Sequence, residues 1–237
     1  MSVVSKVNED MWADFYKGSV SDRELVSFLG VSDVILSGLS KVSQFRKRLV
    51  SSCVINRSVS GGWDVKRILG EPFSQELALI GGEGRDYRIE GRVFRELPDE
   101  LFNSDLMSIL FYVADSICFY RPSLRRMKVV IHHTLVSASP ECDVSNSPEG
   151  VHQDGMDYIV SALVLERVNV TGGDSLIYGA DKVSSVFKMQ LQPGQGVLQP
   201  DLGSELWHEV TPIKRVDIES DGYRSTIGFD FKVLGDI

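Results

Sequence analysis

The second half of the chain alternates short apolar stretches with turn residues, a pattern that is typical of strands. The longest stretches, residues 128–136 and 158–170, are rich in β-branched and apolar residues. Turn signals such as Gln192-Pro193-Gly194 and Asp221-Gly222 separate shorter runs. These runs lie at residues 175–178, 186–191, 196–199, 207–210 and 225–233. Many short strands at short spacing predict an antiparallel sandwich or barrel.

The first 125 residues have a different pattern, which favours helices. Ser21-Asp22-Arg23-Glu24 has the form of a helix cap before the apolar residues of the stretch 25–29, and a second helix is expected from residue 32 past residue 46. Residues 87–94 alternate as a strand would, and a core helix is expected from Asn103 or Ser104 to near residue 121. We expect one domain, residues 1–237, in which residues 1–125 form a helix-rich support and residues 126–237 form the metal-binding β core.

Composition and charge limit the classes of function. Apolar residues make up 43% of the 237 residues and charged residues 24%, as in soluble globular proteins. The net charge of −8 argues against nucleic acid as the main partner. Three distant cysteines, Cys53, Cys118 and Cys142, form no C-x-x-C pair, so we expect no disulfide and a reducing cytoplasm. No secretory signal and no run of about 18 apolar residues is visible, so no membrane partner is expected.

Three polar residues can share one metal ion. His152 and Asp154 form an H-x-D triplet, and on an extended segment residues two apart point to the same side. His208, on a short expected strand, can supply a third ligand. Two imidazoles and one carboxylate on one face leave open positions on Fe(II) for a chelating 2-oxo acid and for O₂. The alternative is that these are surface residues around a turn made by Gly150 and Gly155.

Arg224 makes the iron interpretation more specific. It begins an otherwise apolar last strand, where an inward-facing guanidinium is costly without an anion to pair with. The far carboxylate of 2-oxoglutarate is such an anion, and the planar fork of arginine binds a carboxylate through two hydrogen bonds. Thr226 shares the same strand face and can donate to that carboxylate. A surface salt bridge from Arg224 to Asp217 or Asp221 is the alternative.

Four segments match a known family in their order and spacing. They are His152-Gln153-Asp154, residues 171–177 (TGGDSLI), residues 207–212 (WHEVTP) and Tyr223-Arg224-Ser225. The set resembles the bacterial 2-oxoglutarate/Fe(II) dioxygenases that hydroxylate free amino acids, with the isoleucine 4-hydroxylase group as the nearest, over roughly residues 126–233. The resemblance implies an α+β, mainly β fold: a double-stranded β-helix (a jelly-roll or cupin-like barrel) with N-terminal helices packed on one sheet. It also implies His152, Asp154 and His208 as the catalytic iron ligands and Arg224 as the 2-oxoglutarate clamp.

The residues that would hold the substrate are marked less clearly. Members of the family often carry an arginine shortly after a His-Gln pair on the strand before the triplet, but residues 131–136 here read IHHTLV. His132 and His133 are adjacent, so on a strand they face opposite sides and one of them faces the interior. Tyr158 and Ser161, on the first long strand after the triplet, are further candidates, although ordinary packing explains them equally well.

The sequence therefore predicts an enzyme that uses Fe(II), 2-oxoglutarate and O₂ to hydroxylate an unactivated C–H bond of a small molecule, with a free L-amino acid or derivative as the expected substrate. The carboxylate of Asp154 favours hydroxylation over halogenation, because a halide needs that coordination position. Desaturation and ring formation stay open. Two other classes also stay open: a cupin-like metal enzyme that does not use 2-oxoglutarate, and a non-catalytic small-molecule-binding protein on the same scaffold.

Overall fold

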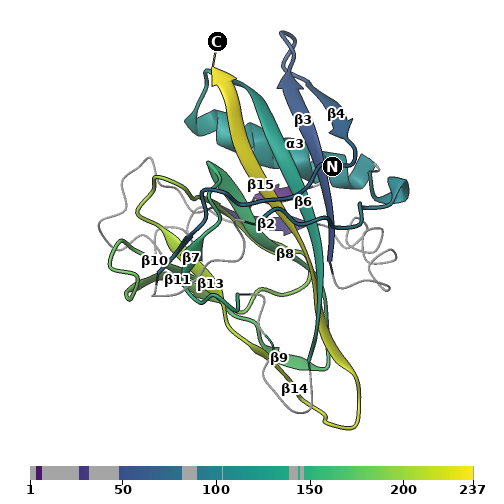
Figure 1. The fold of residues 1–237 in the computed structure, drawn as a ribbon, viewed down its shortest axis with the longest axis vertical. Coiled ribbons are helices and arrows are strands. Elements are labelled where there is room, and N and C mark those ends of the chain that lie inside the picture. The colour runs from purple at the N-terminus through teal and green to yellow at the C-terminus, as the bar shows by residue number, and fades with distance from the viewer. Residues whose placement is uncertain are drawn as a thin grey trace.

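The computed structural model describes residues 4–6, 27–31, 48–81, 90–102, 104–138, 144 and 147–236, and most of them form strands (Figure 1). One sheet has eight strands, all antiparallel to their neighbours, and a second has five. The order in the large sheet is β1 (Val4–Lys6), β2 (Ser27–Val31), β12 (Gln195–Pro200), β8 (Tyr158–Val168), β15 (Gly222–Asp236), β6 (Leu124–Ala138), β3 (Arg48–Arg57) and β4 (Trp63–Ile68).

The small sheet contains the shorter strands. Its order is β11 (Ser185–Met189), β10 (Ser175–Tyr178), β13 (Trp207–Val210), β7 (His152–Gln153) and β5 (Leu79–Ile80). A separate two-stranded ribbon joins β14 (Ile213–Arg215) to β9 (Val170–Gly172). The chain is thus mainly β, as the strand pattern predicts, and the stretch expected as one strand over residues 158–170 divides at Asn169, whose φ is 49°.

One face of the large sheet, here called the α3 face, is covered by helix α3 (Ser104–Tyr120) (Figure 1). The helix begins and ends where the sequence predicts. Its buried residues recur with the spacing of one helix face, and they pack on the large sheet in a single core. The helix contributes Leu106, Ile109, Leu110, Val113, Ala114, Ile117 and Cys118, and β6 contributes Met127, Val129 and Ile131. Among the described residues, no helix is long and apolar enough to cross a membrane.

The opposite face of the large sheet, here called the interior face, lies toward the small sheet. A second apolar cluster joins the layers there, since it contains Val164 and Val197 of the large sheet and Ile177 and Phe187 of the small one. Both faces of the central strand β6 are therefore covered, and residues 129–133 are all buried. Successive residues of β6 and β15 must alternate between two environments of different character.

The helical interpretation of the first half is wrong for much of the described chain. Ser27–Val31 is the strand β2, and β3 and β4 form a hairpin on the edge of the large sheet. Residues 49–53 of β3 are buried without interruption, and an apolar run buried on both sides lacks the alternation that marks a strand. The predicted cap at residues 21–24 and the helix over 32–46 lie outside the described residues. Of the strand predicted over 87–94, residues 90–94 are described, and the prediction is wrong for them, because they make only an isolated bridge from Arg92 to Phe73.

The two described cysteines are free, as the sequence predicts. Cys53 and Cys118 are buried in the core on the α3 face. Burial raises the pKa of the Cys53 thiol to about 12, so this residue acts as a small apolar side chain. Cys142 lies outside the described residues.

Candidate active site

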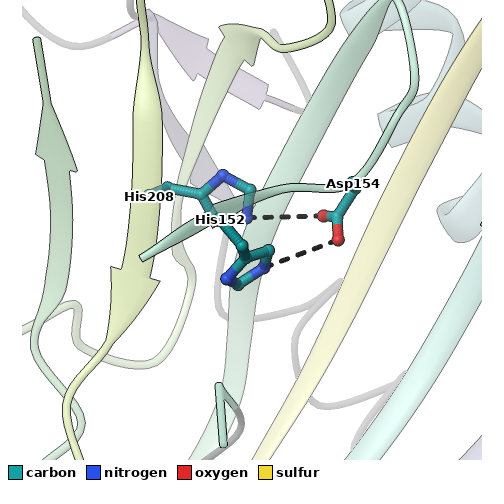
Figure 2. Close-up of side chains that lie close together, drawn as sticks. All are labelled: His152, Asp154 and His208. Atoms are coloured by element: carbon teal, nitrogen blue, oxygen red, sulfur yellow. Dashed lines mark ion pairs between the residues drawn. The ribbon is translucent and has the colours of Figure 1, made fainter. Parts of the chain in front are cut away.

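The small sheet brings the three predicted ligands together. His152 on β7 and His208 on β13 are direct cross-strand partners, and their ring centroids are 4.2 Å apart (Figure 2). Asp154 follows directly after β7, and its carboxylate faces both imidazole rings. His152 Nε2 lies 3.5 Å from Asp154 Oδ1, and His208 Nε2 lies 3.4 Å from Asp154 Oδ2. One donor atom from each residue lies within 4.8 Å of the others, which is the arrangement that one metal ion requires.

The hydrogen bond behind the His152 ring suits metal binding. His152 Nδ1 lies 2.8 Å from the carbonyl oxygen of Gly150. Because a carbonyl only accepts, Nδ1 carries the proton and Nε2 keeps its lone pair for the metal. Nδ1 of His208 lies 3.5 Å from the amide nitrogen of Gln199. The two imidazoles are each only 4% exposed, so the surface interpretation of the triplet is wrong.

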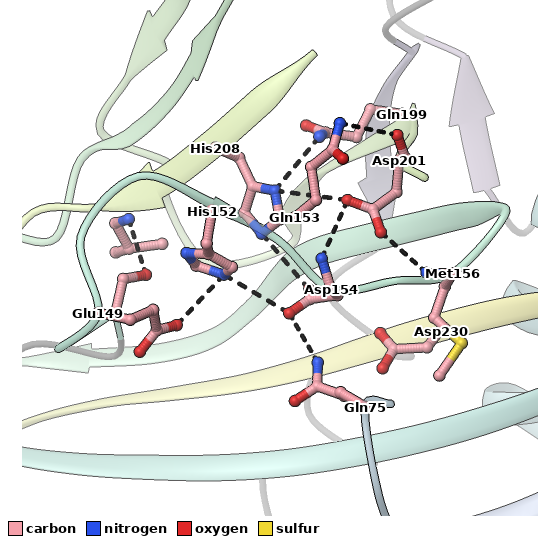
Figure 3. Close-up of polar contacts among 12 residues, drawn as sticks. Gln75, Glu149, His152, Gln153, Asp154, Met156, Gln199, Asp201, His208 and Asp230 are labelled. Atoms are coloured by element: carbon pink, nitrogen blue, oxygen red, sulfur yellow. Dashed lines mark hydrogen bonds and ion pairs between the residues drawn. The ribbon is translucent and has the colours of Figure 1, made fainter. Parts of the chain in front are cut away.

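Asp154 is held from two sides (Figure 3). The Gln75 amide donates to Asp154 Oδ1 at 2.7 Å, and the Asp201 carboxylate accepts the backbone N–H groups of Asp154 and Met156 at 3.2 and 2.9 Å. Burial alone would raise the pKa of Asp154, but the adjacent imidazoles of His152 and His208 hold the pKa well below the usual range. Burial, followed by the nearby charge of Asp154, raises the pKa of Asp201 to about 7.

The middle residue of the H-x-D triplet also has a structural role. Gln153 is 2% exposed and points away from its two neighbours. Its amide donates to the carbonyl oxygens of Asp201, Ser204 and Leu206, at 3.1, 3.2 and 2.7 Å. These bonds hold the segment that leads into β13, and so they set the position of His208 relative to β7.

Gly155 lets another segment approach the triplet. Its φ is +84°, and a Cβ built on it would lie 2.5 Å from the carbonyl carbon of Leu77. A side chain at this position would therefore push away the segment that carries Gln75. Sequence reasoning missed Gln75, Gln153 and Asp201, because no local pattern indicates that residues 75 and 201 lie beside a turn at 155.

Arg224 is buried as predicted, and its charge has no partner in the part of the chain that the structure describes. It is 1% exposed, and none of its three guanidinium nitrogens has a hydrogen-bond partner among the described residues. Burial, and then the nearby charge of Arg167, lower its pKa to about 10. Within the described part of the chain no salt bridge joins Arg224 to Asp217 or Asp221, so the surface-pair alternative is wrong. Thr226 is 5% exposed and lies on the same face of β15.

A second arginine beside Arg224 was not foreseen. Arg167 on β8 is its direct cross-strand partner. The Nη2 group of Arg167 donates to the carbonyl oxygen of Gly172 at 2.6 Å, while its buried Nη1 has no partner among the described residues. A Cβ on Gly173 would lie 3.1 Å from Arg224 Cδ and 3.3 Å from Arg167 Nη1. The glycines of the T-G-G-D segment therefore allow a turn to pack closely against both arginines.

The four substrate candidates do not lie together. His132 belongs to the interior face, where its Nε2 lies 2.7 Å from Asp230 Oδ2. His133 belongs to the α3 face, where its Nε2 lies 3.0 Å from Ser225 Oγ and burial lowers its pKa to about 4. Tyr158 packs against the core of the α3 face, and its cross-strand partner Phe231 belongs to that core. Ser161 is half-buried at an irregularity in the pairing of β8, and its role stays a prediction.

Solved structures resemble this fold at low sequence identity, and three of them illustrate the likeness. The crystal structure of IDO from Bacillus thuringiensis has a TM-score of 0.64 at 15% identity and covers 88% of this chain and 90% of its own. A bsmA homolog from Methylobium petroleophilum PM1 has a TM-score of 0.62 at 19% identity, covering 86% and 82%. The Fe(II)/(alpha)ketoglutarate-dependent dioxygenase TqaL has a TM-score of 0.63 at 16% identity, covering 94% and 86%.

Sequence comparison gives a more specific result. No curated protein sequence matches the chain. The sequence model of the 2OG-Fe dioxygenase family, however, matches residues 37–230, a range that includes the histidines and aspartate of the triad and Arg224. The match spans most of the chain, and the triad within it is compatible with iron. The chain therefore belongs to the 2OG-Fe dioxygenase family and is a 2-oxoglutarate-dependent iron dioxygenase, with Fe(II), 2-oxoglutarate and O₂ as the cofactors that this family implies.

Proposed function

We propose that this enzyme hydroxylates an unactivated C–H bond of a small molecule, and that its substrate is a free L-amino acid or a derivative. His152, Asp154 and His208 hold the Fe(II), and Arg224 with Thr226 binds the far carboxylate of 2-oxoglutarate. The observation that carries this proposal is the guanidinium of Arg224, which is 1% exposed and without a hydrogen-bond partner among the described residues. A buried cation of this kind is costly unless an anion binds it.

The roles of the residues follow from their chemistry. The two Nε2 atoms and the Asp154 carboxylate supply three ligands on one side of a metal, which leaves the other side for 2-oxoglutarate and O₂. When bound, iron and 2-oxoglutarate supply the oxidation, with succinate and CO₂ as co-products. Gln75 and Asp201 hold Asp154, and Gln153 holds the segment before His208. The carboxylate at position 154 favours hydroxylation over halogenation, which needs that coordination position for a halide.

The arrangement of the sheets supports a double-stranded β-helix. Two antiparallel sheets face each other across a shared apolar cluster, and the triad lies on the small sheet. This scaffold is the one that the resemblance to amino acid hydroxylases implies. An isoleucine 4-hydroxylase-like activity is the narrowest form of the proposal, and the absence of an arginine from residues 131–136 argues for a different way of holding the substrate.

Succinate release tests the proposal. Purified enzyme with Fe(II) and 2-oxoglutarate is assayed across the proteinogenic L-amino acids, and turnover with at least one of them is expected. If the enzyme turns over 2-oxoglutarate but no amino acid in the panel increases the rate, the proposed substrate class is refuted. No 2-oxoglutarate consumption under any condition would favour the non-catalytic binding protein.

The Arg224→Ala variant tests the assignment of the clamp. If Arg224 binds the far carboxylate of 2-oxoglutarate, this variant should show a large rise in the KM for 2-oxoglutarate. Arg57→Ala is the control, because Arg57 lies at the end of β3 and contacts Trp63 and also Asp115 of α3, on the face of the sheet opposite to Arg224. Equal KM values in both variants would refute the clamp.

A further inference from the structure

A second pair of arginines lies on the interior side, away from the 2-oxoglutarate clamp. Arg48 begins β3, and Arg92 lies in the segment that bridges to Phe73. The guanidinium carbon of Arg48 is 5.5 and 5.0 Å from the ring centroids of Phe73 and Phe94, and that of Arg92 is 5.8 and 5.4 Å from the same rings. The two cations therefore share one aromatic platform.

These cations have few partners in the described part of the chain. Buried nitrogens without hydrogen bonds there include Nε of Arg48 and both Nε and Nη2 of Arg92. Burial lowers the pKa of Arg48, and the charge of Arg92 lowers it further, against smaller opposing effects led by Asp230 and Asp154. Two neighbouring guanidinium groups with unused donors are the arrangement that binds a carboxylate.

One carboxylate stands beside this pair. Arg48 Nη2 donates to His132 Nδ1 at 3.4 Å, so the proton of the imidazole is on Nε2, which donates to Asp230 Oδ2 at 2.7 Å. Asp230 is 5% exposed and is held by this chain of contacts. Arg48 and Asp230 thus lie on opposite sides of one imidazole ring, a separation that suits the carboxylate and the ammonium of one small molecule.

A short segment connects this cluster to the metal ligands. The ring of Phe73 lies edge-on to His132, with centroids 4.8 Å apart, and two residues later the Gln75 amide donates to Asp154. Phe73 also packs with Val50, Val130 and Phe94, so the surroundings of the charges are apolar. On β15, Asp230 is six residues from Arg224, about 20 Å of strand, which keeps this cluster distinct from the 2-oxoglutarate clamp.

We propose that Arg48 and Arg92 hold the carboxylate of the substrate and that Asp230, oriented by His132, holds its ammonium group. The substrate is then an α-amino acid with an apolar side chain, and its carboxylate is recognised from β3 and residues 92–94, not from β6. This inference rests on the proposed function and adds the residues that select the substrate. His132 acts through Asp230 and is a positioning residue.

Calorimetric titration tests the inference without turnover. The twenty proteinogenic L-amino acids are titrated into the full chain loaded with Mn(II), which replaces Fe(II), and 2-oxoglutarate. The tightest ligand is then compared with its primary amide, which lacks the carboxylate. Wild type should bind the acid about tenfold to a hundredfold more tightly, the effect of one charged hydrogen bond. Binding of 2-oxoglutarate with no amino acid bound would overturn the inference and leave the cofactor assignment intact.

The variants identify the residues. Arg48→Met and Arg92→Met should each raise the Kd of the amino acid by the same tenfold to hundredfold factor and leave the Kd of the amide unchanged. The Kd of 2-oxoglutarate should stay within about twofold of the wild-type value. Asp230→Asn should weaken the binding of the amino acid and of its amide equally, because both ligands carry the ammonium group. Arg57→Met, at the other end of β3, is the matched control. Equal losses for acid and amide in Arg48→Met, or a loss confined to 2-oxoglutarate, would overturn the assignment.

Two further measurements keep the test decisive. If Arg48→Met does not fold, Arg48→Lys answers the question, because it keeps the charge but lacks the planar fork and should show an intermediate preference for the acid. Arg224→Met should abolish 2-oxoglutarate binding. If it does not, or if wild type does not bind 2-oxoglutarate, the proposed function fails, whatever the outcome for Arg48.

Discussion

The two faces of the large sheet differ although the same strands form them. On the α3 face, β15 places Ile227, Phe229 and Phe231 in an apolar core under the helix. On the interior face, the same strand places Arg224, Thr226 and Asp230, which occupy alternate positions. Alternation along one strand therefore separates the residues that stabilise the fold from those that we assign to cofactor and substrate, one position apart.

The adjacent histidines of β6 show the difference most clearly. His133, on the α3 face, bonds to Ser225 and lies among apolar residues that lower its pKa to about 4. His132, on the interior face, lies between Arg48 and the carboxylate of Asp230. On the α3 face polar groups are few, and the imidazole of His133 is paired within the protein. On the interior face the arginines have N–H groups without a partner among the described residues, and these groups can bind a ligand.

The largest effect is expected on the interior side. Asp154→Ala removes one of three ligands and should reduce metal-dependent succinate release to background, because Fe(II) loses its one anionic protein ligand and is bound more weakly by the two imidazoles. Iron content after anaerobic reconstitution measures the loss. Asp64→Ala, an exposed aspartate on the edge strand β4, is the control and should keep both iron and activity. Full iron occupancy in Asp154→Ala would contradict the triad.

A substitution on the α3 face should have the opposite profile. Phe229 is fully buried in the core beneath α3, so Phe229→Ala leaves a cavity and should lower the free energy of unfolding by about 3–5 kcal/mol. Urea denaturation measures this change. At a temperature where the variant is still folded, its KM for 2-oxoglutarate should equal that of wild type. A raised KM would show that the two faces are coupled.

The pH dependence of stability should report His133. Its pKa falls from 6.5 in the unfolded chain to about 4 in the folded protein, because burial disfavours the charged imidazole. Between these values the unfolded chain binds the extra proton, so stability is complete above pH 6.5 and falls as the pH approaches 4, by about 3 kcal/mol. His133→Leu should flatten this part of the curve, measured by urea unfolding from pH 7 to pH 4.5. An unchanged slope would contradict the assignment.

Local patterns predicted much of the functional site, because its residues carry local signals. The H-x-D triplet predicts two ligands on one side of a strand, and the structure brings both together with His208. An arginine in an apolar strand predicts a buried anion site; Arg224 is buried without a hydrogen-bond partner among the described residues, and its role stays a prediction. The strand predicted over residues 207–210 has the same bounds as β13, because alternating polar and apolar residues between two turns indicate a strand and not a helix.

The first half was less predictable for a physical reason. The run in β3 is buried on both faces, so its pattern contains no period that distinguishes a strand from a helix. Arg48 and Arg167 were missed because their roles depend on residues of neighbouring strands, His132 for Arg48 and Arg224 for Arg167, which are distant in the sequence. For His132 and His133, alternation predicts two opposite faces, but only the packing of α3 decides which of them is interior.

The smallest expected effect is a gain in stability from a substitution on the interior face, and it distinguishes the two faces most sharply because most buried substitutions destabilise a protein. Arg224→Met removes a buried cation that lacks a partner in the described chain, so without 2-oxoglutarate the variant should be more stable than wild type, by about 1 kcal/mol. Most core substitutions do the reverse, as Phe229→Ala should on the α3 face. Thermal unfolding in Mn(II), without 2-oxoglutarate, measures the difference.

Added 2-oxoglutarate should then reverse the order of the two proteins. A ligand that binds only the folded state stabilises it by an amount that grows with its concentration over Kd, about 2.7 kcal/mol at a hundredfold excess. Wild type should gain this stability and Arg224→Met should not. If the variant is less stable than wild type even without 2-oxoglutarate, the guanidinium has a partner within the protein. The interior face would then be stabilised in the same way as the α3 face, by contacts within the chain.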